Sequence, residues 1–167
     1  MTDVDAPAVL EVFAHLSPDS LRYRFFSPVH HLTAGVAADL VRVDDERRVV
    51  LLAFDDHDRL AGEARAVRHA DDPATADVAV TVADEYQRRG LGSKLLKLVG
   101  KASLDVGIDR LAGHVLVDNP GGRALLIANG AMVNFYEPGV LAFEIPLGRH
   151  RTVSPAVAAR RTLGLAS

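Results

Sequence analysis

Residues 77–106 hold the feature that most restricts the fold: a strand pattern that passes through a glycine turn directly into a long helical pattern. The strand is predicted over residues 77–82, DVAVTV, and the helix over residues 91–106, where apolar side chains recur on one face. The turn between them contains QRRGLGSK, with two glycines and three cations in eight positions. A tight turn needs about one glycine and no positive charge, so this turn calls for a functional explanation.

The other periodicities of the chain predict a layered domain. Helical patterns are expected at residues 6–16, 17–26, 32–43, 91–106 and 119–130, and strand patterns at residues 47–56, 60–69, 77–82, 110–117 and, as a last hairpin, 135–146. The first two strands form a hairpin, and the third is expected antiparallel to the second. Helices combined with an antiparallel meander and a helix crossover indicate one α+β (mixed α/β) domain. We expect it to span residues 1–147, followed by a basic, Ala-rich tail at residues 148–167.

Composition excludes several classes of protein. The chain has 167 residues, a formal net charge of −3 and no cysteine. It therefore has no broad basic field for nucleic acid, no disulfide and no cysteine nucleophile. The acidic N-terminus lacks the pattern of a signal peptide, and no apolar run reaches the ~20 residues of a membrane span. These features predict a soluble cytoplasmic protein that binds neither nucleic acid nor membrane.

The glycine turn has the properties of an anion site. A helix start leaves about four backbone N–H groups without partners and adds roughly half a positive charge. Gly90 and Gly92 let the backbone approach a ligand, and Arg88, Arg89 and Lys94 add cations. The spacing fits neither a P-loop nor a dinucleotide fingerprint. A phosphate or pyrophosphate is the expected ligand, and a purely structural turn is the alternative.

The pattern Gln-x-x-Gly-x-Gly after a strand resembles the acetyl-CoA loop of the GNAT superfamily of N-acetyltransferases. Further on, VLVDNPGGRALLIANGA resembles the next strand and helix of that family, and AHLSPDSLRYRFFSP resembles its bacterial protein-lysine acetyltransferase subgroup. The resemblance covers residues 5–147. It implies a central, mostly antiparallel twisted sheet flanked by helices, with acetyl-CoA bound where the fourth and fifth strands of the family separate.

The resemblance also assigns a cofactor site. The residues expected at the pyrophosphate are Gln87, Arg88, Arg89, Gly90, Leu91, Gly92 and Ser93, and those at the pantetheine are Thr81, Val82 and Ala83. Asn119 matches an Asn that opens a helix in the family. It either faces the pantetheine or serves only as a helix cap.

The implied reaction moves an acetyl or other acyl group from acetyl-CoA to a primary amine of a small molecule or a protein lysine. An amine with a reference pKa near ~10.4 must lose a proton before it attacks the thioester. Family members often use a Glu about ten residues before the loop, and Asp77 stands at that position. Because Asp is shorter, a water relay is expected, and a solvent-facing charge is the alternative reading. Glu63 is the second candidate base.

At two positions the sequence departs from the family pattern, and these departures favour a function without efficient catalysis. The usual acidic Tyr is replaced by Leu126, and the aromatic residue after the closing glycine is replaced by Ala131. A thiolate with a pKa around ~8.5 can leave without an acid, so these changes weaken activity rather than exclude it. The alternative is a degenerate domain that binds acyl-CoA as a regulatory or interaction module. The histidines, including the adjacent His30 and His31, lack the spacing of metal ligands, so no metal is expected.

The family also opens with an edge strand before its first helix. Only MTDVDAP precedes the helical pattern here, so we expect this strand to be missing or truncated and the strand at residues 47–56 to have an open edge. The C-terminal tail, the short N-terminus or a second copy of the chain could cover it. The tail has too few alternating apolar residues for a good strand, which favours a homodimer.

Overall fold

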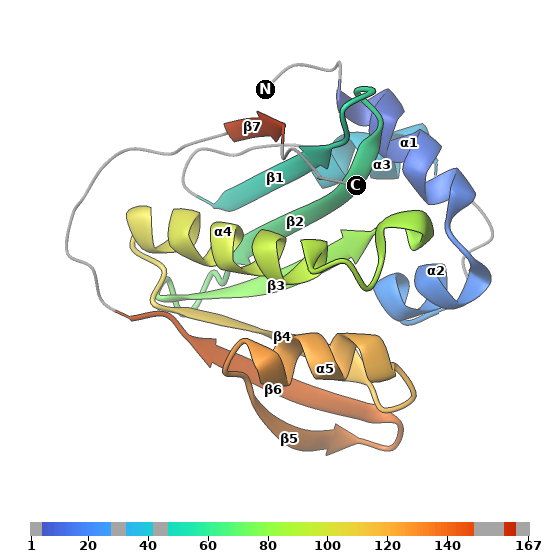
Figure 1. The fold of residues 1–167 in the computed structure, drawn as a ribbon. Coiled ribbons are helices and arrows are strands. Elements are labelled where there is room, and N and C mark those ends of the chain that lie inside the picture. Colours follow the sequence, from blue (N-terminus) through green and yellow to red (C-terminus); the bar gives the residue numbers. More distant parts are fainter. Residues whose placement is uncertain (1–4, 28–32, 42–46, 149–158, 163–167) are drawn as a thin grey trace.

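The computed structural model describes residues 5–27, 33–41, 47–148 and 159–162, and it has the predicted α+β architecture (Figure 1). The helices are α1 (Asp5–His15), α2 (Pro18–Phe25), α3 (Ala34–Val41), α4 (Leu91–Asp105) and α5 (Pro120–Ala128), with a short 3₁₀ helix η1 (Asp84–Tyr86). The strands are β1 (Arg48–Phe54), β2 (Leu60–Arg68), β3 (Thr75–Val82), β4 (Arg110–Leu116), β5 (Met132–Glu137), β6 (Val140–Pro146) and β7 (Ala159–Thr162). None of the described helices is both long enough and apolar enough to span a membrane.

One sheet runs through the whole structure in the order β5-β6-β4-β3-β2-β1-β7. Neighbouring strands are antiparallel except for the pairs β3–β4 and β1–β7, which are parallel. The predicted hairpin of the first two strands and the antiparallel pairing of the second and third are confirmed. Helices α4 and α5 cover one face of the sheet, and α1 and α3 pack on the other face, over β1 and β2 (Figure 1).

Small residues on β2 let α4 lie close to the sheet. A Cβ atom on Gly62 would come within 2.8 Å of the Thr81 carbonyl oxygen and 3.1 Å of the Leu95 side chain. Ala64 and Ala66 point to the same face and are fully buried. The alternate residues of β2, among them Glu63, therefore point to the opposite face, which carries α1, α2 and α3.

Local sequence signals account for the ends of several elements. Ser17 caps α2 by accepting a hydrogen bond from the Ser20 N–H, and Pro18 occupies the first helical position as predicted. The prediction placed the start of β3 two residues late and that of β5 three residues late, and it missed η1. These segments are set by contacts with distant parts of the sheet, which local periodicity does not record.

The C-terminal tail supplies the strand that covers the edge of β1. Residues 159–162 form β7, and Leu51 to Phe54 pair with them in parallel (Figure 1). The expectation that this tail makes no strand is therefore wrong. A four-residue edge strand needs backbone pairing on only one side, so it depends less on alternating apolar side chains than the prediction assumed. The N-terminal residues 1–4 lie outside the described part.

Removing the tail should expose the β1 edge. We expect deletion of residues 149–167 to leave unpaired N–H and C=O groups beside a buried apolar strand, and so to promote association between chains. Light scattering at a series of protein concentrations checks this. A truncated chain with the same molar mass and solubility as the full chain would contradict β7 as the cover, and a dimer in the full chain would support the homodimer proposal.

Candidate active site

The central feature of the site is the point where β3 and β4 stop pairing. Only three residue pairs join these strands: Thr75 with Arg110, Ala76 with Leu111, and Asp77 with Ala112. Beyond Asp77, β3 continues for five residues and β4 for four without a shared ladder (Figure 1). We call these segments, residues 78–82 and 113–116, the β3–β4 divergence. Its strand edges offer backbone hydrogen-bonding groups to an extended ligand.

The glycine turn places the start of α4 beside the divergence. Gly90 is the N-cap residue of α4, with φ of 81°, and no side chain caps the helix. A residue with a Cβ is strained in this left-handed conformation, although space around Gly90 is open. Leu91 is buried in the core, so only its backbone N–H can serve a ligand. The first turn of α4 therefore presents amide groups and the positive end of the helix dipole.

Gly92 has protein neighbours on the side where a Cβ atom would point. A Cβ atom at this position would lie 3.4 Å from Leu125 of α5 and 3.7 Å from Val82 of β3, which are ordinary contacts. It points toward protein rather than into open space. Gly90 thus meets a backbone requirement, while Gly92 lies where α4, α5 and β3 come together.

Gln87 is exposed, and its side-chain amide links the loop to β3, η1 and α2. Its Nε2 lies 3.1 Å from the Val82 carbonyl oxygen, 2.7 Å from Oδ1 of Asp84 and 3.2 Å from Oγ of Ser20. The Asp84 carboxylate also accepts hydrogen bonds from the Ser17 N–H and the Ser20 hydroxyl. Asp84 therefore joins the start of α2 to the glycine loop. The sequence analysis missed it, since the signal is only an acidic residue three positions before Gln87.

A second network anchors the same loop to the turn between β1 and β2. The Tyr86 hydroxyl donates to the buried Asp55 carboxylate at 2.6 Å, and Arg59 donates to both residues. The Tyr86 hydrogen bond and those from Arg59 hold the pKa of Asp55 well below its usual range. Burial, followed by the hydrogen bond to Asp55, raises the pKa of Tyr86 to about 12. The Arg89 guanidinium lies 5.9 Å from the centre of the Tyr86 ring.

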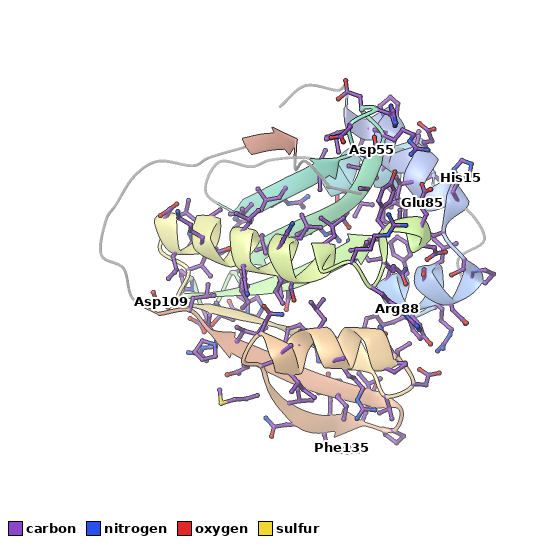
Figure 2. All side chains as sticks on the ribbon, in the orientation of Figure 1. His15, Asp55, Glu85, Arg88, Asp109 and Phe135 are labelled. Carbon is purple, nitrogen blue, oxygen red and sulfur yellow. The ribbon has the colours of Figure 1, made fainter. Side chains whose placement is uncertain are left out.

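Three exposed cations lie in the glycine loop and the first turn of α4. Figure 2 shows Arg88 at the end of the molecule where α2 and the start of α4 meet. Arg88, Arg89 and Lys94 are all exposed, and Arg88 adopts a positive φ of 60°. Ser93, in the first turn of α4, accepts a hydrogen bond from Nδ2 of Asn129 at 2.9 Å. The three cations add a positive field to the uncapped helix start.

The predicted pantetheine edge lies largely in the divergence. Thr81 and Val82 belong to the part of β3 that pairs with β2 but not with β4. Both backbone groups of Ala83 have protein partners, since its N–H donates to the Ala61 carbonyl and its carbonyl accepts from the Tyr86 N–H. The Thr81 side chain is buried and donates to Glu63. A ligand strand would therefore pair with residues before Ala83.

Asn119 acts as a helix cap. Its Oδ1 accepts a hydrogen bond of 2.8 Å from the Gly122 N–H at the start of α5. The side chain lies so close to Gly122 that a Cβ there would be 2.6 Å from Nδ2 of Asn119. Nδ2 keeps its donor capacity toward a ligand, so capping and cofactor contact are compatible at this residue.

Asp77 lies at the vertex of the divergence, on the face of the sheet opposite to α4. It forms the last pair with β4, its side chain is 65% exposed, and its Oδ1 lies 3.0 Å from Nε2 of His69. An exposed carboxylate at this point can accept a proton from a molecule that approaches on the open face. The structure thus gives Asp77 a position next to the predicted cofactor edge.

Glu63 has an environment that suits an anchor better than a base. Its side chain is 2% exposed, and Oε1 accepts hydrogen bonds from Arg24 at 3.0 and 3.1 Å and from Thr81 at 3.0 Å. Arg24 is almost as deeply buried. The Glu63 carboxylate is thus the charge partner of a buried guanidinium, and its loss would leave Arg24 unpaired in the interior.

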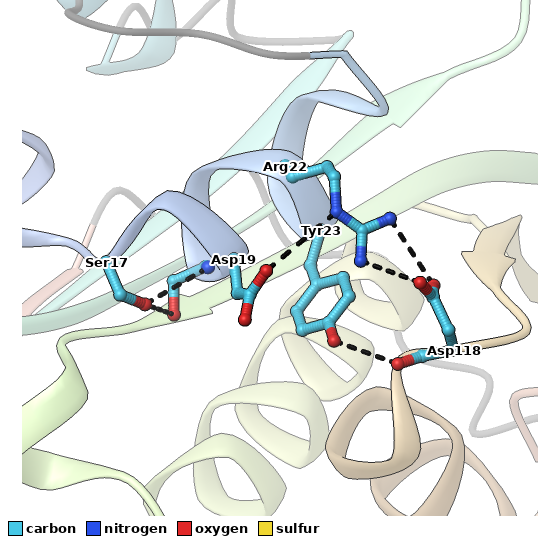
Figure 3. Close-up of polar contacts among 6 residues, drawn as sticks. Ser17, Asp19, Arg22, Tyr23 and Asp118 are labelled. Atoms are coloured by element: carbon cyan, nitrogen blue, oxygen red, sulfur yellow. Dashed lines mark hydrogen bonds and ion pairs between the residues drawn. The ribbon is translucent and has the colours of Figure 1, made fainter.

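Helix α2 bridges the open end of the divergence. On one side Arg24 binds Glu63 of β2, and on the other Arg22 donates to the Asp118 carboxylate at 2.7 Å. The Tyr23 hydroxyl donates to the Asp118 carbonyl at 2.8 Å (Figure 3). The hydrogen bonds from Arg22 lower the pKa of Asp118. Sequence reasoning missed these residues, because nothing local relates α2 to a loop about ninety positions later.

Leu126, Tyr136 and Tyr23 differ in burial and in the residues that they contact. Leu126 is buried in the core of α5, and Leu125 is the residue whose side chain reaches Gly92. Tyr136 is 57% exposed on β5, with its ring centre 4.4 Å from that of His114. The Tyr23 hydroxyl donates to the carbonyl of Asp118, the residue directly before Asn119.

In the described ranges, no three His, Asp or Glu side chains gather as ligands for a metal ion. His30 and His31 lie outside these ranges.

Tyr86 should give the protein a pH dependence in the alkaline range. Its folded-state pKa of about 12 exceeds the ordinary value of 10.0, so its stabilisation is complete below pH 10.0 and is lost as the pH rises toward about 12. We expect Tyr86→Phe to flatten the fall in the free energy of unfolding over this interval. At neutral pH the same change should cost about 1 kcal/mol for one hydrogen bond.

Urea unfolding at a series of pH values measures both effects, and Tyr136→Phe is the matched control because its ring is exposed. An alkaline profile that is identical in Tyr86→Phe and the parent would contradict the anchoring network.

Comparisons with known proteins agree with this geometry. Residues 11–130 match the family model described as the acetyltransferase (GNAT) family. Acetyltransferase Pat of Mycolicibacterium smegmatis is 32% identical over 124 residues, which are 74% of this chain and 37% of Pat. The chain therefore spans little more than a third of that relative.

Solved structures show the same fold. The GNAT domain of S. lividans PAT superposes with a TM-score of 0.78 at 28% identity, covering 88% of each chain. The structure of yncA from Salmonella typhimurium, which holds its cofactor acetyl-CoA, superposes with a TM-score of 0.68 at 15% identity, covering 92% of this chain and 95% of yncA. At that identity the likeness concerns the fold alone. Since the family model spans most of the sequence, the chain belongs to the acetyltransferase (GNAT) family.

Proposed function

We propose that this chain transfers an acetyl group from acetyl-CoA to a primary amine. The observation that carries the proposal is the β3–β4 divergence beside the uncapped start of α4. An extended pantetheine can pair with the free edge of β3, while the pyrophosphate meets the amides of Gly90, Leu91, Gly92 and Ser93. Arg88, Arg89 and Lys94 add charge at the phosphates, and Asn119 donates from Nδ2 to the pantetheine.

The chemistry proceeds by direct attack in a ternary complex. The neutral amine nitrogen attacks the thioester carbonyl carbon, the new C–N bond forms, the C–S bond breaks, and CoA leaves as a thiolate. The proton lost by the amine passes to Asp77, through a water molecule because the carboxylate is short and exposed. A thiolate with a reference pKa near ~8.5 tolerates the absence of a nearby acid.

A protein lysine is the proposed class of acceptor. The support is similarity to Pat and to the PAT GNAT domain, together with the open face on which Asp77 lies. An exposed carboxylate on an uncovered part of the sheet can be reached by a side chain presented on another protein. Small primary amines are the alternative acceptors.

One observation favours a second function. Leu126, at the position of the usual family acid, is packed in the core, so α5 presents no proton donor there. The chain would then bind acyl-CoA without efficient turnover, as a regulatory or interaction module. Binding and turnover assays on the same protein separate the two.

Cofactor binding should depend on Gly90. We expect Gly90→Asp to abolish measurable acetyl-CoA binding, because it adds a negative charge at the pyrophosphate and strains the left-handed cap. Gly107→Asp is the matched control, since Gly107 has nearly the same φ of 83° in equally open space. Calorimetric titration of each variant with acetyl-CoA is the measurement. Equal affinity in Gly90→Asp and the parent would remove the loop from the cofactor site.

Turnover should depend on Asp77. We expect Asp77→Asn to lower kcat by about 10²-fold, the lower end of a general base contribution, while acetyl-CoA affinity is kept. Thiol release with a panel of amines and lysine peptides measures it. Glu144→Gln, another half-exposed carboxylate, is the control.

If kcat is unchanged in Asp77→Asn, Asp77 is not the general base, and Glu63 or water takes that role. For Glu63→Gln we expect a large loss of stability, because the buried Arg24 loses its partner. A stable, inactive Glu63→Gln protein would support Glu63 as the base instead.

A further inference from the structure

Arg65 stands in the middle of β2, on the face opposite to α4. Gly62 of the same strand approaches Leu95 of α4, and alternation along the strand turns Glu63 and Arg65 to the other face. The Arg65 side chain is half-buried. Burial, and then the nearby charge of Arg24, lower the pKa of its guanidinium, which remains charged at neutral pH.

When Arg65 itself is counted, the three arginines of this cluster outnumber its two carboxylates, Glu63 and Asp39. Glu63 is bound by Arg24 and Asp39 by Arg48, so each nearby carboxylate already has an arginine. Among the residues that the structure describes, Arg65 forms no hydrogen bond or ion pair. A half-buried charge without a partner is costly, and Arg is seldom retained in such a place without one.

Arg65 also lies beside the candidate active site. It is paired directly with Ala79 of β3, which is two residues beyond the last β3–β4 pair and so on the free edge. Directly opposed residues have Cβ atoms about 5 Å apart, and Ala79 places only a methyl group between Arg65 and the divergence. Asp77 is next on the same face of β3 and is exposed. A cation and a carboxylate therefore flank one short stretch of the edge.

We propose that Arg65 binds a carboxylate of the acceptor, so that the preferred substrate is a primary amine carrying a carboxylate a few bonds from the nitrogen. The inference rests on the proposed acetyl transfer. The planar guanidinium fork fits one carboxylate bidentately, and the negative charge of that carboxylate balances the positive charge of Arg65. The same chemistry comes from two sources, a free ω-amino acid or a protein lysine beside an acidic residue.

Matched acceptors test this with the full chain and acetyl-CoA. The free arm compares γ-aminobutyrate and δ-aminovalerate with their amides. The peptide arm compares a lysine flanked by Glu with the same lysine flanked by Gln. We expect the carboxylate member of one arm to show kcat/KM about tenfold to a hundredfold higher, mainly through KM, and the arm that shows it identifies the source.

Arg65→Gln should remove this preference and leave acetyl-CoA affinity unchanged. Arg110→Gln, which loses an exposed pair with Glu144, is the matched control and should keep the preference. Because Arg65 has no hydrogen-bond or ion-pair partner to lose among the described residues, the melting temperature of Arg65→Gln should stay the same or rise. A preference that persists in Arg65→Gln overturns the inference, as does a melting temperature lowered by several degrees.

A direct binding measurement separates this inference from acetyl transfer itself. Hexanoate, titrated against the protein by NMR, should shift resonances around Arg65 in the parent and bind at least tenfold more weakly to Arg65→Gln. If no amine is acetylated, the proposed function fails, and the hexanoate titration still shows whether Arg65 binds a carboxylate. If amines are turned over but hexanoate binds both proteins equally, acetyl transfer stands and the carboxylate site does not.

Discussion

The separation of β3 from β4 is the constraint on which the rest of the structure depends. Two parallel strands that pair over only three residues leave backbone groups on both edges without strand partners, so side chains, water or a ligand must supply the hydrogen bonds. The chain keeps the edges apart with packed elements on both sides. On one face Gly92 of α4 and Leu125 of α5 lie against Val82, and on the other α2 reaches from Glu63 to Asp118. The opening is therefore a built feature of the domain.

Two polar networks fix the glycine loop at the end of that opening. Asp84 ties it to α2, and Tyr86 with Asp55 ties it to the turn between β1 and β2. Both networks use residues directly before Gln87, so the segment that leads into the loop is held from two sides. An anion site built from backbone amides needs such support, because its donors cannot shift to follow a ligand. The buried Arg24–Glu63 pair contributes in the same way by fixing α2, which explains why a residue that resembled a candidate base serves as an anchor.

The sequence predicted what is local and missed what is long-range. Periodicity located every α-helix and six of the seven strands in the described part of the chain but not the 3₁₀ helix η1, and the Gln-x-x-Gly-x-Gly turn located the start of α4 with its glycine cap. It could not find Arg22 and Tyr23 as partners of Asp118, or Asp84 as a partner of Ser17, because each contact joins positions far apart in the chain. β7 was rejected for a poor alternating pattern, yet pairing with an existing strand edge requires backbone groups more than side-chain pattern. Asp77 could be selected by spacing, whereas only the fold shows that Glu63 is buried against Arg24.

The position of Leu126 bears on how the thiolate leaves. Because Leu126 faces the core and Leu125 faces Gly92, the side of α5 toward the loop is apolar at this turn. An apolar wall disfavours the charged thiolate, so a donor elsewhere would matter more than the reference pKa alone suggests. Tyr86 is excluded as that donor, because Asp55 and burial keep its proton. Tyr136 lies against His114 on the outer hairpin. Tyr23 is held at the open end of the divergence by Asp118, and because its hydroxyl donates to the Asp118 carbonyl, it can protonate a thiolate only after that hydrogen bond breaks.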